Sequence, residues 1–155
     1  MTLSAGNGND MTIAKMSVAE LETFLHHEFP QAFSAGDISI ESADGTTALL
    51  RQRYSERMLR PGGTVSGPTL MALADFAMYV VLLSAIGPVG LAVTTNLNIN
   101  FLRKGQPGQD VMAAAKLMKL GKRLAVGEVT LLSGTTPDPI AQVTATYSIP
   151  NAAQS

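Results

Sequence analysis

Residues 68–86 read PTLMALADFAMYVVLLSAI, a stretch in which almost every side chain is apolar. Pro68 at its start and Gly87 just beyond its end are residues that typically bound a helix. A helix that is apolar on every side must be surrounded by protein or by lipid. Asp75 interrupts the stretch, and neither flank carries the aromatic and basic anchors of a membrane span. The stretch therefore predicts a buried core helix.

The sequence on both sides of this helix predicts strands. In residues 38–54, Ile38 and Ile40 alternate with polar residues, the Asp44-Gly45 turn follows, and a second strand-like run begins at Ala48. This order is typical of a hairpin. Residues 124–132 are strand-like in composition, and residues 141–148 alternate between apolar and polar side chains. Residues 110–120, DVMAAAKLMKL, favour a helix by composition, although their position between strands leaves a strand open.

Residues 93–101 show the clearest alternation in the chain, with a period of two that predicts a strand. One face carries Val93, Thr95, Leu97, Ile99 and Phe101. Thr94 falls on the opposite face, together with three asparagines.

A shorter helix is predicted near the N-terminus. Ser17 stands three residues before Glu20, which is the spacing of a capping box, and apolar residues then recur at helical spacing until Pro30. His26 and His27 lie on this helix. Because they are sequence neighbours, they point to different faces and do not form a two-histidine metal site.

The length of 155 residues fits a single domain. We expect that domain to span residues 15–150, after a flexible segment at 1–14 and before a tail at 151–155. The predicted elements indicate an α+β fold in which an antiparallel sheet wraps around one long central helix, with the extra helix at the N-terminus.

Composition excludes several classes of function. With 46% hydrophobic and 15% charged residues, the chain is not intrinsically disordered. It has no cysteine, so a disulfide, a thiolate metal site and a cysteine nucleophile are all excluded, and we expect no metal. A net charge of −1 and 5% aromatic residues are a poor match to a nucleic-acid binder. The N-terminus lacks the pattern of a secretory signal, so we expect a cytoplasmic protein that is not inserted in a membrane.

Asp75 is the first candidate for chemistry. An ionised carboxylate in an apolar helix costs several kcal/mol when it has no partner. Either Asp75 pairs with an arginine as a structural ion pair, or it borders a polar cleft, where it would act as a general base or a nucleophile.

The start of the helix is the second candidate. Gly67 allows close approach of a ligand to the backbone, and free amides at a helix N-terminus attract developing negative charge, so its N–H is a candidate oxyanion donor. Ser66 is placed to cap the helix. It is not expected to be a nucleophile, because residues 63–67, GTVSG, do not form a nucleophile elbow and no histidine is nearby.

Gly67 and Asp75 are too far apart to act together within one chain. They are separated by eight residues, or about 12 Å along a helix axis, whereas a reacting carbonyl must lie about 3 Å from both the donor and the base. Two antiparallel copies of the helix could bring the glycine of one subunit to the aspartate of the other. A catalytic role therefore predicts a symmetric dimer with sites at its interface.

Three segments together resemble the hotdog-fold acyl-CoA thioesterases, and most closely their phenylacetyl-CoA thioesterase branch. They are residues 60–75, RPGGTVSGPTLMALAD, residues 93–105, VTTNLNINFLRKG, and residues 141–147, AQVTATY. The resemblance implies a hotdog fold and a homodimer that assembles further into a tetramer. It also implies an acyl-CoA substrate, hydrolysed to free acid and CoA without any cofactor.

The resemblance also implies roles for individual residues. Asp75 matches the catalytic carboxylate, Gly67 matches the glycine whose amide polarises the thioester carbonyl, and Thr94 matches the residue that orients the attacking water. Gly63 keeps a loop glycine, but Ser66 stands where the family has histidine, and Arg60 where it has asparagine.

The basic residues fall into groups that either coat the surface or bind a local anionic ligand. The resemblance favours the CoA phosphates as that ligand. The expected substrate-binding residues are Arg60, Gly63, Ser66, Arg103, Lys104, Lys122 and Arg123. Met71, Phe76 and Tyr79 either line an acyl tunnel or simply pack in the core.

Two other functions remain open on the sequence alone. The replaced histidine and asparagine are compatible with a non-catalytic acyl-CoA-binding or regulatory protein. A hotdog dehydratase is disfavoured, because it normally needs a histidine at the site and both histidines here lie on the N-terminal helix. A thiol-release assay on a panel of acyl-CoAs separates hydrolysis from binding.

Overall fold

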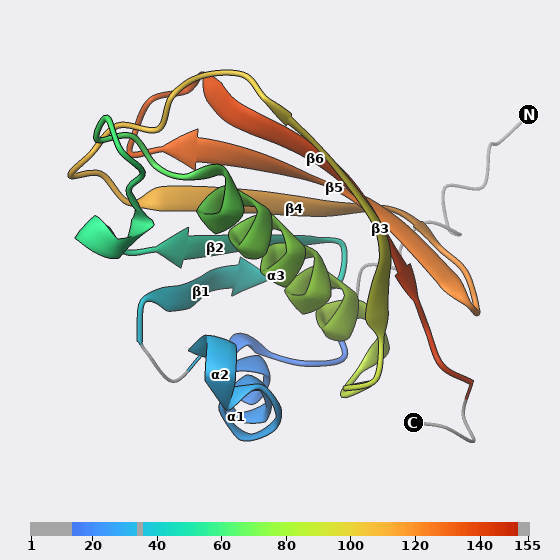
Figure 1. The fold of residues 1–155 in the computed structure, drawn as a ribbon. Helices are drawn as coiled ribbons and strands as arrows, with labels where there is room; N and C mark the ends of the chain where they lie inside the picture. The colour runs from blue at the N-terminus through green and yellow to red at the C-terminus, as the bar shows by residue number, and fades with distance from the viewer. Residues whose placement is uncertain (1–13, 34–35, 152–155) are drawn as a thin grey trace, which may run out of the picture.

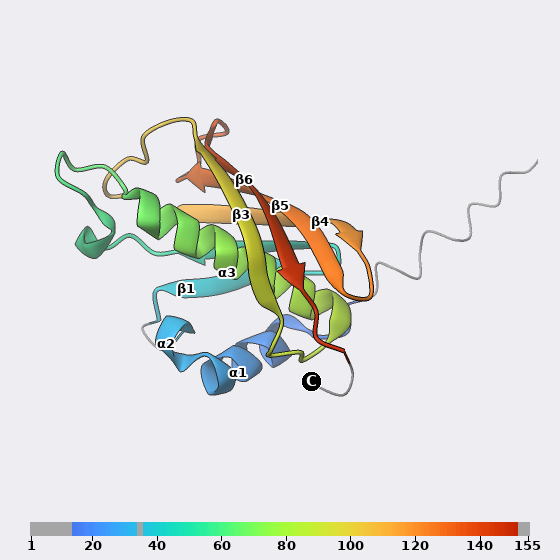
Figure 2. The same cartoon turned by 45° about the vertical axis from the view of Figure 1, so that its right-hand side comes forward.

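The computed structural model describes residues 14–33 and 36–151. A six-stranded antiparallel sheet, in the order β1-β2-β4-β5-β6-β3, curves around one long helix (Figures 1 and 2). This confirms the predicted architecture. The elements are α1 (Val18–Glu28), α2 (Pro30–Phe33), β1 (Ile38–Ala43), β2 (Thr47–Gln52), a short 3-10 helix η2 (Glu56–Met58), α3 (Gly67–Ile86), β3 (Val93–Phe101), β4 (Val111–Leu120), β5 (Leu124–Ser133) and β6 (Pro139–Ser148). The expected segments at 1–14 and 151–155 lie almost entirely outside the described residues.

Helix α3 forms the centre of the core, as predicted. Ser66 is its N-cap, with Pro68 in the first turn, and Gly87 ends it with a φ of 98°. By length and composition α3 is long and apolar enough to cross a membrane, but most of it is buried inside the fold. In its second half, from Phe76 to Ser84, every side chain is buried, because the curved sheet covers one side of the helix and α1 packs against it as well.

Residues 111–120, whose composition favours a helix, form strand β4. Val111, Ala113 and Ala115 are buried, whereas the residues between them are only half-buried. The strand pairs with β2 on one side and β5 on the other. Backbone pairing on both sides, together with small side chains that fit against α3, outweighs the weak local preference for helix.

The N-terminal helix forms as predicted, with both hydrogen bonds of the capping box between Ser17 and Glu20. Leu21 and Leu25 are buried where α1 covers β1 and α3. His26 and His27 are both exposed. In the part of the chain that the structure describes, no three histidine, aspartate or glutamate side chains group together in a way that could hold a metal ion.

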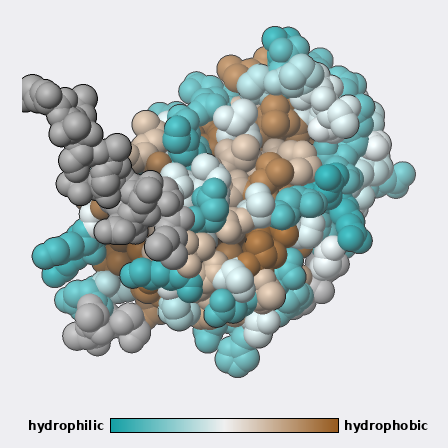
Figure 3. Space-filling view, turned by 180° about the vertical axis from the view of Figure 1, so that it is seen from behind, coloured by the Kyte–Doolittle hydropathy of each residue, from teal (hydrophilic) through white to brown (hydrophobic). Residues whose placement is uncertain are grey.

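The two faces and the two edges of the sheet differ. The face opposite α3 carries polar side chains mixed with apolar patches (Figure 3). Strand β1 is one edge, next to α1, and β3 is the other edge. Figure 2 shows β3 with β6 along one side and no strand along the other.

Candidate functional site

Asp75 is half-buried in the middle of α3, and two hydroxyl groups contact the same oxygen of its carboxylate. Thr94 Oγ1 donates to Asp75 Oδ1 at 2.5 Å, and the Tyr147 hydroxyl donates to Oδ1 at 2.8 Å. Within residues 14–33 and 36–151, no ion pair includes Asp75 and no side chain hydrogen-bonds its Oδ2. The interpretation of Asp75 as a structural ion pair with arginine is therefore wrong for this chain.

A β-bulge brings Thr94 to Asp75. The pairing of β3 with β6 slips between Thr94 and Asn96, so that Thr95 is the extra residue. With strict alternation, Thr94 would face away from α3 with the asparagines. The bulge instead turns Thr94 to the same face as Leu97, which packs on the core. Bulges at sheet edges commonly redirect a side chain toward a functional site.

Tyr147 is the functional residue that the sequence analysis missed. It lies directly opposite Thr94 in the β3–β6 ladder, and residues paired in this way project from the same face of the sheet. Its ring stacks on Tyr79 with a centroid distance of 6.1 Å. The alternation of residues 141–147 already placed Tyr147 on the buried face, and that was the signal available for it, because a buried phenol needs a hydrogen-bond partner.

Burial raises the pKa of the Tyr147 phenol well above its ordinary value. A hydrogen bond with Thr94 lowers this pKa by less, and the nearby Asp75 carboxylate raises it further. Burial also raises the pKa of Tyr79, with a smaller contribution from the charge of Glu28. Tyr147 therefore stays protonated at neutral pH, which keeps it a hydrogen-bond donor.

Two cavities meet at Asp75. One has a volume of about 510 Å³ and lies between α3 and the α1–α2 segment, and the other has about 660 Å³ and opens beside the start of β3. Asp75, Phe29, Tyr79 and Tyr147 line both cavities. The first is mostly apolar and includes Phe76, but the exposed Met71 lines neither cavity. Of the three residues expected beside an acyl tunnel, the structure places two at a cavity.

Within one chain, Pro68 and Thr69 in the first turn of α3 line the first cavity with Asp75, but Gly67 lies about 12 Å from Asp75 along the helix axis. Ser66 Oγ accepts a hydrogen bond from the Thr69 backbone at 3.3 Å, so Ser66 caps the helix. The first N–H groups of a helix have no intrahelical acceptor, which leaves the Gly67 amide for a ligand. Gly67, Ser66, Gly63 and Arg60 line neither cavity, and Arg60 is exposed.

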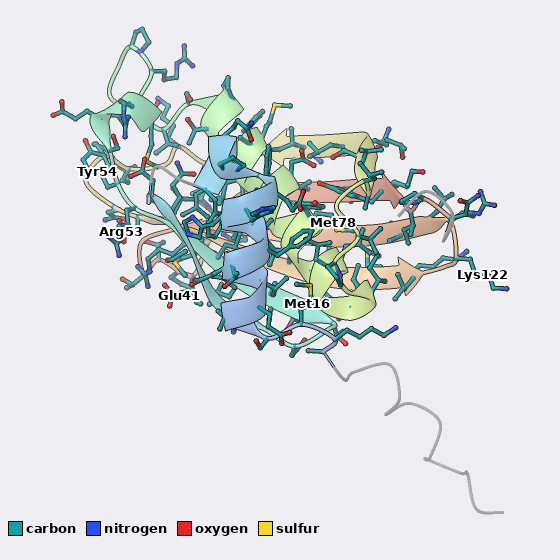
Figure 4. All side chains as sticks on the ribbon, turned by 90° about the horizontal axis from the view of Figure 1, so that it is seen from below. Met16, Glu41, Arg53, Tyr54, Met78 and Lys122 are labelled. Atoms are coloured by element: carbon teal, nitrogen blue, oxygen red, sulfur yellow. The ribbon has the colours of Figure 1, made fainter. Side chains whose placement is uncertain are left out.

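The expected phosphate-binding residues lie at opposite ends of the sheet. Arg103 and Lys104 follow β3 at the end where α3 begins, because the next residue, Gly105, accepts a hydrogen bond from Val65 at 3.2 Å. Lys122 and Arg123 form the β4–β5 turn at the other end, where Figure 4 shows Lys122 on the far side of the molecule from Tyr54. One chain therefore does not bring the two basic groups together.

The geometry at Asp75 suits a reaction that needs a carboxylate base or nucleophile. One oxygen is held by two hydroxyl donors, the other is free, and an apolar cavity adjoins the group. Among the residues that the structure describes, no histidine, lysine or arginine lines either cavity. Glu28 also lines the second cavity, but it is exposed, whereas Asp75 is half-buried and held by two hydroxyls, so Asp75 is the candidate reactive group in these cavities.

Comparison with known proteins identifies the family of this chain. The sequence profile described as the thioesterase superfamily matches residues 62–140, which include Gly67, Asp75 and Thr94. Acyl-coenzyme A thioesterase 13 of Homo sapiens is 28% identical over 108 residues, which cover 69% of this chain and 76% of that protein.

Solved structures share the fold. A candidate thioesterase from Silicibacter sp. TM1040 is 41% identical, with a TM-score of 0.82 over 90% of this chain and 96% of that one. The PaaI protein of E. coli, from the phenylacetic acid degradation operon, is 24% identical, with a TM-score of 0.68 over 84% of this chain and 95% of that one. The predicted hotdog fold is thereby confirmed, and the chain belongs to the thioesterase superfamily as a thioester hydrolase.

Proposed function

We propose that this protein hydrolyses an acyl-CoA thioester to the free acid and CoA, at a site completed between two copies of the chain. The observation that carries the proposal is Asp75, whose carboxylate is held by Thr94 and Tyr147 where two cavities meet. The similarity to an acyl-coenzyme A thioesterase supports CoA as the carrier of the acyl group.

The carboxylate can act in either of two ways. As a general base, Asp75 takes a proton from water, the resulting hydroxide attacks the thioester carbonyl, and the C–S bond breaks with return of the proton to the departing sulfur. As a nucleophile, Asp75 attacks the carbonyl itself, CoA leaves, and water hydrolyses the resulting anhydride. A single turnover in ¹⁸O-water separates these routes, because only the second can leave ¹⁸O in the Asp75 carboxylate.

The edge strand β3 supports a dimer. It offers unpaired backbone groups along its length, and Val93 and Phe101 at its two ends are 55% and 53% exposed. Such an edge is a template for pairing with a second chain. A copy added antiparallel about the strand centre would set Phe101 of one chain opposite Thr94 of the other.

This pairing would also bring Gly67 to Asp75. A Cβ atom on Gly67 would lie 3.2 Å from the Phe101 ring, so Gly67 lies beside the end of β3, whereas Thr94 contacts Asp75 near its start. In the antiparallel dimer, the Gly67 amide of one chain therefore approaches the Asp75 carboxylate of its partner. There it would donate a hydrogen bond to the oxyanion formed at the carbonyl.

The same arrangement accounts for the separated basic residues. Arg103 and Lys104 lie at the Gly67 end of the chain, and Lys122 and Arg123 lie at the Tyr147 end, since the Ile149 N–H donates to the Arg123 carbonyl at 2.8 Å. Antiparallel copies would place the first pair from one chain near the second pair from the other. Four cations around one opening suit the phosphates of CoA.

Release of free CoA thiol from a panel of acyl-CoAs tests the proposal. Wild type is expected to release CoA at a steady rate from at least one member, and Asp75→Asn is expected to lose this activity. Asp138→Asn, in the exposed turn before β6, is the matched control and should retain it. Saturable binding without release by wild type would contradict hydrolysis and would instead indicate a non-catalytic acyl-CoA-binding protein.

A further inference from the structure

We propose that Tyr147 is a positioning residue: its hydroxyl, together with that of Thr94, holds Asp75 Oδ1 and leaves Oδ2 as the reactive oxygen. This inference rests on the proposed hydrolysis at Asp75. It assigns a role to a side chain that lines both cavities beside Asp75.

The Tyr147 hydroxyl has two acceptors on Asp75 within hydrogen-bond distance, and it prefers the carboxylate. Its hydroxyl lies 2.8 Å from Asp75 Oδ1 and 3.0 Å from the Asp75 backbone carbonyl. A phenol has one proton, and a carboxylate is a stronger acceptor than an amide carbonyl, so Oδ1 is the preferred acceptor. The second contact keeps the phenol over the helix turn that carries Asp75.

The framework around Tyr147 is rigid. Tyr147 is buried in β6, its ring stacks on Tyr79, and the Tyr79 hydroxyl donates to the Gly90 carbonyl at 3.0 Å. Thr94 faces it directly across the ladder. Two donors from neighbouring strands therefore fix one oxygen of a carboxylate on a third element. This is the kind of preorganisation that holds a catalytic group within a small angular range.

The charges around Asp75 make these hydrogen bonds important. The other titratable groups that line its cavities are Glu28 from α1, Tyr79 from α3 and Tyr147 from β6. None of them is a cation. Hydrogen bonds given to a carboxylate favour its charged form. In the described part of the chain, the two hydroxyls are the side-chain groups that stabilise the anion.

The kinetic test compares wild type, Tyr147→Phe and the control Tyr54→Phe, which loses the same atom at a residue that lines neither cavity. Loss of one hydrogen bond to a charged group should lower kcat by about 10-fold to 100-fold. KM should change by less than about 2-fold, because the phenyl ring still packs.

These results separate positioning from packing. Unchanged kcat in Tyr147→Phe would overturn the proposal. A rise in KM at unchanged kcat would also overturn it, because it would indicate a packing or binding role. Tyr54→Phe should match wild type in every parameter.

A second readout does not depend on turnover. A buried phenol proton bonded to a carboxylate should give a low-field proton NMR signal in wild type that is lost in Tyr147→Phe and moves upfield in Asp75→Asn. If the signal behaves so while wild type hydrolyses no thioester, the proposed function fails and the hydrogen bond stands. If the signal is unmoved by Asp75→Asn, Tyr147 does not donate to Asp75, and the inference fails even if the enzyme is active or Tyr147→Phe does not fold.

Discussion

Thr94 and Thr95 are sequence neighbours on β3, but only Thr94 contacts Asp75. Thr94 Oγ1 donates to the carboxylate at 2.5 Å, whereas the exposed Thr95 donates to the Thr146 carbonyl at 3.3 Å. The bulge between Thr94 and Asn96 produces this difference. The two threonines therefore form a matched pair for testing the hydroxyl at Asp75.

Thr94→Val should lower kcat by about 10-fold or more, because it removes a hydrogen bond to a charged group while keeping the shape of the side chain. Thr94→Ser should retain most of the activity, since it keeps the hydroxyl. Thr95→Val is the control, and its steady-state kinetics should match wild type. Equal losses in Thr94→Val and Thr95→Val would contradict the assigned contact.

A residue is predictable from the sequence where one rule decides the outcome. Ser66 is the N-cap that its position predicts, whereas the catalytic role of Asp75, a lone carboxylate in an apolar helix, stays a prediction. The facing direction of Thr94 was not predictable from alternation, because a single inserted bulge residue inverts the pattern. Tyr147 was visible as buried, but its partner depends on a contact between residues 72 positions apart.

At the scale of elements, one carboxylate links the end of β2 to the start of β4. Asp110 accepts hydrogen bonds from the Tyr54 backbone at 2.8 Å and from Arg51 at 3.0 Å. The Tyr54 N–H, followed by Arg51, lowers the pKa of Asp110 below the ordinary value of 3.8, although burial partly opposes this. The contribution of Asp110 to stability is therefore fully present above pH 3.8 and is lost as the pH falls through its lowered folded pKa.

Asp110→Asn should lower the free energy of unfolding at pH 7 and flatten its decrease below pH 3.8. Urea unfolding followed by circular dichroism between pH 2 and pH 7 measures both effects. A variant profile that runs parallel to that of wild type through the acid range would show that Asp110 contributes no such linkage.

The α1–α2 segment forms one wall of the apolar cavity. Phe29 caps α1, lies 6.0 Å from Phe76 between ring centroids, and lines both cavities beside Asp75. If the acyl chain occupies the cavity of about 510 Å³, the Phe29 ring limits its length. The N-terminal helices would then set substrate preference as well as cover the core.

Phe29→Ala should shift the preference toward longer acyl chains. The ratio of kcat/KM for a long-chain to a short-chain acyl-CoA should rise by about 10-fold, because each added methylene gains apolar contact in the enlarged space. Measuring the ratio within one variant cancels any general loss of activity. An unchanged ratio would indicate that the acyl chain lies elsewhere.

At the scale of the whole molecule, sequence reasoning predicted the architecture because α3 is a continuous apolar stretch bounded by Pro68 and Gly87, and because most strands show alternation. It was undecided at residues 110–120, where alanine, leucine and lysine favour a helix and only the sheet supplies the pairing that makes β4. The order of strands in a sheet cannot be predicted from a single sequence. Only the structure shows that β3 is an edge strand.

The proposed dimer can be weakened near its expected two-fold axis. Asn98 is exposed at the middle of β3, and it pairs with the exposed Thr144 on β6. Asn98→Lys would set two like charges close together across the interface and weaken dimerisation by at least about 5-fold. Thr144→Lys, one strand further in, should leave the dimer intact. Sedimentation of the two variants at matched concentrations measures the difference, and equal association of both would contradict pairing through β3.

The most direct measurement of a shared site mixes two inactive variants. Asp75→Asn removes the carboxylate. Gly67→Pro removes the amide at a first-turn position where proline is tolerated, and the atoms nearest to the added Cβ belong to the Phe101 side chain rather than to backbone. In a random mixture, each mixed dimer holds one intact site, so thiol release should recover to about a quarter of the wild-type rate. Mixed dimers that form and stay inactive would contradict a site built from Gly67 of one chain and Asp75 of its partner.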